Sequence, residues 1–231
     1  MSTAETVPID RRQRRRLETI EEVLDIAAEI MTEQGVAGLS IGEIARRMGI
    51  RPPSLYVYFP SKNALYDALF ARGAERILAV AEQQHLDSPA DGRELEQQLL
   101  TSARAFVGWC VANPAYTQLL FWRPVPGFTP SAEAYAPAVR MIESTQQWFA
   151  GLQERGLLRA DAHVDAVLRD FTVLTSGVIS QQLSNAPDEA PESGRFVAAL
   201  PDLVAMFARH YAAATPSSTT SRGRARHADR R

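Results

Sequence analysis

Hydroxyl and cationic side chains gather in one short stretch of the sequence, from Ser40 to Lys62. They include Ser40, Arg51, Ser54, Tyr56, Tyr58 and Lys62. Each of these groups can donate a hydrogen bond to a phosphate oxygen, and arginine and serine can also reach the edges of bases. Lys62 is the only lysine in a chain with 25 basic residues. These residue types suggest contact with a nucleic acid.

The spacing of apolar residues before and within this stretch predicts two helices joined by a tight turn. Apolar residues recur every three or four positions from Leu17 to Gln34, and Gly35 ends this first helix. Ser40 then precedes a short second helix, with Glu43 placed to complete a capping box. Gly49 permits the left-handed backbone that a tight exit from that helix requires.

A third helix would begin at Pro52 and Pro53, because proline fits only the first positions of a helix. Leu55 and Phe59 are four residues apart and can both point inward. In a helix-turn-helix, this last helix reads bases in the major groove while neighbouring groups hold phosphates. Tyr58 has an alternative role, packing beside Phe59 against the fourth helix. The residues expected to contact DNA are Ser40, Ile41, Arg51, Pro52, Pro53, Ser54, Tyr56, Val57, Tyr58 and Lys62.

The segment from Gly38 to Leu65 resembles the N-terminal domain of TetR-type repressors. The resemblance covers roughly residues 17 to 70 and includes Ser-Leu-Tyr-x-Tyr-Phe at 54–59 and Lys-x-x-Leu at 62–65. It implies an all-helical homodimer whose divergent C-terminal domain binds a small molecule and then releases a palindromic operator. Gly42 departs from the family pattern, because members often carry a longer polar or basic side chain there to reach a base. We therefore expect specificity to rest more on the third helix and on the arginine run described next.

Positive charge concentrates at the two ends of the chain. Five arginines fall within residues 11–16 and five within residues 222–231, whereas 11 arginines and 17 acidic residues lie between Asn63 and Thr215. We expect residues 1–16 to form a flexible basic arm that contacts DNA, since cations close to phosphates release counterions. Residues 215–231 lack apolar side chains at their start and are expected to form a disordered basic tail.

The remaining sequence shows helical periodicity and no sustained alternation, which predicts an all-α fold. A helix-turn-helix domain would occupy residues 17–62 and a linking fourth helix residues 63–84. A helical bundle for ligand binding and dimerisation would occupy residues 85–214, with Asp161 capping one of its longer helices. The apolar faces of residues 162–184 and 200–213 are candidates for the dimer interface.

Aromatic residues in the second half could line a pocket for a small apolar or aromatic effector. Such residues are equally typical of a helical core. The proline-rich stretch at residues 123–130 could form an adjustable wall of the pocket. The candidate pocket residues are Phe106, Trp109, Cys110, Tyr116, Trp122, Phe128, Tyr135, Trp148 and Phe171.

Several classes of function lack support in the sequence. One cysteine and four scattered histidines offer no metal site, and nothing indicates a cofactor. No apolar run is long enough to cross a membrane, and the N-terminus lacks the pattern of a secretory signal, so we expect a cytoplasmic protein. Phosphate-binding loops and catalytic motifs are missing as well, which favours a regulator over an enzyme that carries a DNA-binding head. A DNA-binding scaffold that responds to a protein partner remains an alternative, and the sign of regulation stays open.

Overall fold

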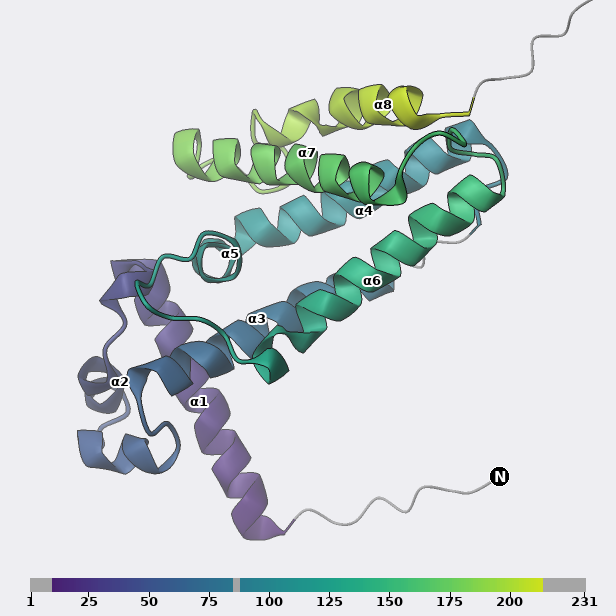
Figure 1. Ribbon diagram of the computed structural model, residues 1–231. Coiled ribbons are helices and arrows are strands. Elements are labelled where there is room, and N and C mark those ends of the chain that lie inside the picture. The colour runs from purple at the N-terminus through teal and green to yellow at the C-terminus, as the bar shows by residue number, and fades with distance from the viewer. Residues whose placement is uncertain (1–9, 85–87, 214–231) are drawn as a thin grey trace, which may run out of the picture.

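The computed structural model describes residues 10–84 and 88–213 of the chain (Figure 1). Within these ranges the ordered backbone is helical, and an isolated bridge between Leu158 and Ala212 is the only β pairing. The all-α prediction is therefore confirmed. In chain order the elements are α1 (Arg11–Gln34), η1 (Val36–Gly38), α2 (Ile41–Arg47), η2 (Pro52–Val57), α3 (Lys62–Gln83), α4 (Gly92–Ala112), α5 (Pro114–Phe121), α6 (Ala132–Glu154), α7 (Val164–Asn185), η3 (Val197–Ala199) and α8 (Leu200–Tyr211), where η marks a 3-10 helix.

Two packed regions share the long helix α3. At one end, α1, α2 and η2 surround the start of α3, and we call this region the head (Figure 1). At the other end, α4 packs against α7 and α8, while α6 runs along α3, and we call this region the body. No helix in the described part of the chain is long and apolar enough to cross a bilayer.

The core of the head includes residues from the second half of the sequence. Tyr66, Leu69 and Phe70 of α3 are buried there, as expected for the fourth helix of this arrangement. The same cluster contains buried residues of α5 and the start of α6, namely Ala115, Tyr116, Leu119 and Ala134. The head and the body are therefore joined by shared side-chain packing as well as by α3.

The arginine run at residues 11–16 is helical in the structure, which corrects the expectation that the arm is flexible there. Helix α1 begins at Arg11, and the amide of Arg14 donates to the carbonyl of Asp10 at 2.9 Å. Arginine is a good helix former, so the helix extends backward through the run without help from apolar burial. Residues 1–9 of the arm, and the basic tail from residue 215 onward, lie outside the described residues.

One other helix start differs from the expectation, and a further one has a clear side-chain cap. Helix α7 begins at Val164, with His163 rather than Asp161 at the N-cap, and Asp161 instead pairs with Arg159 at 3.5 Å. Helix α6 begins at Ala132, where the hydroxyl of Ser131 accepts a hydrogen bond from the amide of Ala134. A side-chain cap of this kind satisfies an amide that has no partner inside the helix, which favours a helix start at this point.

Candidate nucleic-acid interface and ligand cavity

The predicted turn joins α2 to η2 in the structure. Gly49 has a φ of 68°, in the left-handed region, and the amide of Ile50 donates to the carbonyl of Ala45 at 3.0 Å. The element predicted as the third helix is a single 3-10 segment, Pro52–Val57. Pro52 and Pro53 cannot donate backbone hydrogen bonds, and Pro60 disfavours further helix, so the segment stays short.

The segment η2 presents an exposed face opposite two buried anchors. Leu55 and Phe59 are 1% and 6% exposed, as their spacing predicted. Tyr56 and Val57 are 51% and 68% exposed. Arg51, Pro52, Pro53 and Ser54 are exposed too, so all six predicted residues from Arg51 to Val57 that were assigned to this face are open to a partner. An exposed tyrosine beside an exposed valine is unusual on a surface without a binding role.

Tyr58 occupies a different position from its neighbours. It is half-buried and packs against the core of the head, and the Arg16 guanidinium lies 5.3 Å from the centre of its ring. This placement corresponds to the packing alternative, although the partner above the ring belongs to α1. Tyr58 therefore links the end of η2 to the arginine run at residues 11–16.

Ser40 stands at the N-cap of α2, but the predicted capping box does not form. Its hydroxyl makes no capping hydrogen bond, although the backbone there is extended as at other N-caps, and the residue is exposed. The Glu43 carboxylate accepts hydrogen bonds from Arg46 at 2.7 and 2.8 Å and from Arg47 at 3.0 Å. The Ser40 hydroxyl and the first amides of α2 are thus free to meet an anion, with Ile41 half-buried beside them.

Arg47 ties α2 to α1 by an ion pair. Arg47 also donates to Glu33 of α1, with its two terminal nitrogens at 3.1 and 2.5 Å from the carboxylate oxygens. Hydrogen bonds from Arg46 first, and from Arg47 second, lower the pKa of Glu43 to about 2. Arg46 and Arg47 are engaged with carboxylates. The free positive charge beside the exposed face of η2, which we call the reading face, must therefore come from other residues.

Lys62 supplies one such charge. It is the exposed first residue of α3, and its ammonium group lies 3.4 Å from the carbonyl oxygen of Ala37 and 5.4 Å from the centre of the Tyr66 ring. The Tyr66 hydroxyl in turn donates to the carbonyl of Val36 at 2.7 Å. These contacts hold the lysine beside the turn that precedes Ser40.

The arginine run supplies further charge beside the reading segment. A shallow groove separates the first turns of α1 from Val57 and Tyr58. Because the run is helical, its side chains are held close to the reading face instead of being spread along a loose arm. The groove is lined by Asp10, Arg12, Gln13, Arg15, Arg16, Thr19, Val57 and Tyr58.

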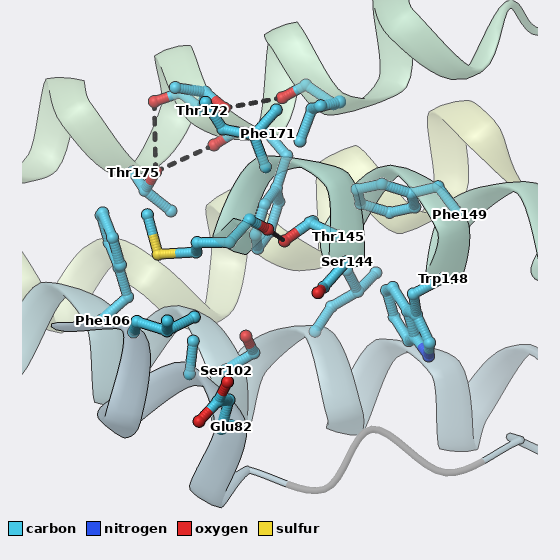
Figure 2. Close-up of a pocket in the computed structure, with 16 residues that line it drawn as sticks. Glu82, Ser102, Phe106, Ser144, Thr145, Trp148, Phe149, Phe171, Thr172 and Thr175 are labelled. Carbon is cyan, nitrogen blue, oxygen red and sulfur yellow. Dashed lines mark hydrogen bonds between the residues drawn. The ribbon is translucent and has the colours of Figure 1, made fainter. Parts of the chain in front are cut away.

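The body contains a cavity of about 340 Å³ between α3, α4, α6 and α7 (Figure 2). Of the nine predicted pocket residues, Phe106, Trp148 and Phe171 line it. Its wall is completed by Leu78, Ala81, Glu82, Leu99, Ser102, Met141, Ile142, Ser144, Thr145, Phe149, Leu168, Thr172 and Thr175. These thirteen residues were missed by the sequence analysis. The serines and threonines that interrupt the apolar faces of α6 and α7 were the one sign in the sequence that these faces line a cavity.

The other six predicted pocket residues lie outside this cavity. Cys110 and Tyr116 are buried in the packing between helices, and Trp109 lies next to Tyr116 with ring centres 6.4 Å apart. Trp122 and Tyr135 are each 42% exposed. Burial raises the pKa of Cys110 to about 12, so its thiol is a packing group at neutral pH.

The proline-rich loop packs on the head, whereas we expected it to form a pocket wall. Phe128 lies against Tyr66, with ring centres 5.6 Å apart. Ser131, at the end of the loop, donates through its amide and its hydroxyl to the Asp67 carboxylate at 2.6 and 2.7 Å. The ring of Phe128 finds apolar contacts in the core of the head and is therefore unavailable to the cavity.

Comparisons with known proteins cover both halves of the chain. The family model for bacterial regulatory proteins of the tetR family matches residues 23–69, and the model for the tetracyclin repressor-like C-terminal domain matches residues 99–204. The HTH-type transcriptional regulator Rv1816 of Mycobacterium tuberculosis is 27% identical over 139 residues, which are 60% of this chain and 58% of that protein. The chain thus spans less than two thirds of the length of this relative.

Two further relatives agree with this picture. The tetracycline repressor protein class D of Escherichia coli is 37% identical over 86 residues, 37% of each chain. A structure of a protein of unknown function from Rhodococcus sp. RHA1 superposes with a TM-score of 0.67 at 19% identity, covering 84% of this chain and 95% of the other. This structure supports the fold, while the family models match the head and the body separately. The chain belongs to the TetR family of bacterial regulatory proteins.

Proposed function

We propose that the protein is a transcriptional repressor that binds a palindromic DNA operator as a homodimer and releases it when a small apolar molecule occupies the body. The observation that carries this proposal is the exposed face from Arg51 to Val57, held by the buried anchors Leu55 and Phe59. Family membership supports the same reading.

On the DNA side, each part of the head has a separate role. The exposed residues of η2 meet base edges, because this short segment projects polar and apolar side chains away from its two buried anchors. Ser40, the first amides of α2 and Lys62 hold phosphates on one side of η2. The helical arginines hold the backbone beyond Tyr58 on the other side.

Dimerisation would use α7 and α8, whose outer faces carry large exposed apolar residues. Val173 is 65% exposed and Met206 is 60% exposed. Pairing of these helices with their copies would cover both side chains and place two heads about a dyad. Each head would then read one half-site, with the half-sites about 34 Å apart or a multiple of that distance.

Helix α3 offers a direct route from the cavity to the head. It begins at Lys62 on the DNA side and reaches the cavity at Leu78 and Glu82. A ligand that spreads α3 from α4, α6 and α7 would tilt the helix and change the spacing of the two heads. Ligand and operator would then weaken each other's binding by the same factor.

This role requires no catalysis, and action on chromosomal DNA would place the protein in the cytoplasm. A scaffold that responds only to a protein partner is the second candidate. The cavity favours the ligand-responsive regulator over the scaffold, since it lies between four helices and is lined largely by apolar groups.

Selection of bound sequences from random DNA, followed by titration of the selected operator, tests the proposal. The variant Tyr56→Ala with Lys62→Ala should bind this operator about a hundredfold more weakly, since each contact is worth about 1–3 kcal/mol. The matched control, Val139→Ala with Arg140→Ala, removes an exposed apolar side chain and an exposed cation from α6 and should bind normally. Operator binding by a folded Tyr56→Ala, Lys62→Ala variant with parental affinity would refute the DNA assignment.

A further inference from the structure

The wall of the cavity in the body carries charge of one sign. Four aromatic side chains line it, and among the described residues of its wall Glu82 alone is charged. Of the described residues that form its wall, none carries a positive charge. Figure 2 shows Glu82 and Ser102 on the side formed by α3 and α4, with Thr172 and Thr175 across from them on α7.

The three threonines of the wall have already used their protons. Thr145 donates to the carbonyl of Met141 at 2.8 Å, and Thr172 donates to that of Leu168 at 2.8 Å. Thr175 donates to the carbonyl of Phe171 at 3.0 Å. A hydroxyl that donates its single proton to its own helix can only accept a further hydrogen bond. These threonines and Glu82 therefore offer acceptors to a ligand.

Aromatic ring faces add to the same preference. Phe106, Phe149 and Phe171 lie around the cavity, and the faces of such rings carry partial negative charge. A cation placed over a ring face is attracted to it, whereas a buried anion without a cationic partner pays a large cost for leaving water. The hydroxyls of Ser102 and Ser144 can donate or accept, so they fit either kind of ligand. The threonines, Glu82 and the rings together favour ligands that donate hydrogen bonds or carry positive charge.

We propose that the cavity takes an aromatic amine or a similar apolar molecule with a cationic or donor group, and discriminates against carboxylates and phosphates. The rings enclose the apolar part, and the cationic group lies at the side of Glu82 and Ser102. This inference deepens the proposed function by naming the ligand class, but the binding preference stands without any DNA contact.

A matched pair of probes tests the preference on the full-length protein by calorimetry at pH 7 without DNA. Biphenyl-4-ylmethylamine and biphenyl-4-carboxylate share two rings and carry opposite charges. The amine should bind at least about tenfold more tightly than the carboxylate. Equal or tighter binding of the carboxylate, or no binding of either probe at millimolar concentration, would overturn the inference.

Two substitutions on α3 locate the cause of the preference. Glu82→Gln should weaken amine binding about three- to fivefold, the size expected for an exposed charge pair. Glu75→Gln removes an exposed carboxylate of the same helix that does not line the cavity, and should leave binding unchanged. Equal binding by the two variants would contradict the role of Glu82. Because no DNA is present, failure of the operator proposal would leave these results unaffected.

Discussion

The candidate site in the head is built from one continuous stretch of sequence, whereas the site in the body is assembled from separate helices. In the head, the groups that would meet DNA come mainly from one continuous stretch, Ser40 to Lys62, and most of them are exposed. In the body, the 16 residues around the cavity come from four helices and extend from Leu78 to Thr175. A continuous site can be changed one side chain at a time without affecting the core, whereas the cavity is part of the core.

The two regions also differ in what holds them together. The head adds ion pairs between helices to its apolar core, such as the pair that joins Arg47 of α2 to Glu33 of α1. The body uses aromatic contacts: Phe149 lies 6.0 Å from Phe171 and 6.4 Å from Phe207, measured between ring centres. Substitutions in the body should therefore act mainly on stability, and those on the surface of the head mainly on DNA binding.

The largest effect is expected for Phe149→Ala. Phe149 is fully buried, and its truncation should lower the free energy of unfolding by about 3–5 kcal/mol. Val57→Ala, at an exposed position of the reading face, should leave this free energy nearly unchanged and weaken operator binding. Urea unfolding followed by circular dichroism measures the first effect. If Phe149→Ala lowered the free energy of unfolding by less than about 1 kcal/mol, the two regions would not differ in how substitutions affect stability.

Gly73→Ala tests the contact between α3 and α5. A Cβ atom at residue 73 would lie 2.7 Å from Cδ1 of Tyr116, so one helix must shift, at a cost of about 1–3 kcal/mol. Gly108→Ala on α4 is the matched control, because nothing lies within 4 Å of its added Cβ. That control should be neutral or stabilising. The same urea series measures both variants, and equal stability of the two would show that the α3 to α5 contact adapts freely.

The reading face could be predicted from sequence because its determinants are local. The prolines fix where η2 begins, and the four-residue spacing of Leu55 and Phe59 fixes which side is buried. Tyr56 and Val57 must then lie on the outside. The start of α1 was predicted too late, because helix propensity in the arginine run is a weaker signal than apolar periodicity.

The cavity could be predicted only in part, because it depends on where helices cross. Periodicity shows that Phe106 and Trp109 lie on helices, but both fit a core equally well. Only the packing of α4 against its neighbours directs Phe106 to the cavity and Trp109 to Tyr116. The sequence alone does not distinguish Thr172 and Thr175 from other helix residues. Only the packing of α7 across the cavity from Glu82 shows their role.

A smaller effect, confined to the head, is expected for Glu43→Gln. The depressed pKa of Glu43 means that its ionised form stabilises the fold at neutral pH. This contribution is complete above about pH 4.5 and is lost as the pH falls towards 2. The stability gap between the parent and Glu43→Gln should therefore narrow below pH 4.5, as urea midpoints measured from pH 7 to pH 3 would reveal. A gap independent of pH would mean that the carboxylate acts by shape alone.

The smallest effect is expected for Gly42→Lys. A Cβ at residue 42 would meet only the Ser40 hydroxyl, at 3.6 Å, so the fold should tolerate a side chain there. The added cation should raise operator affinity a few-fold. It should also make the slope of log affinity against log salt concentration steeper by about one, since one more counterion is released. Titrations between 50 and 200 mM salt would measure this, with Gly42→Ala as the uncharged control. If both variants bound alike, the second helix would lie too far from DNA to contribute.

The core shared by the head and α5 limits how this protein can be recombined. Phe128, Tyr116, Leu119 and Ala134 pack on the head although they lie far downstream in sequence. A chimera joined near residue 84 would leave this side of the transplanted head open to water, as a patch prone to aggregation. Exchange of operator specificity between relatives would therefore succeed only when the surface residues of η2 are replaced, or when residues 114–137 travel with the head.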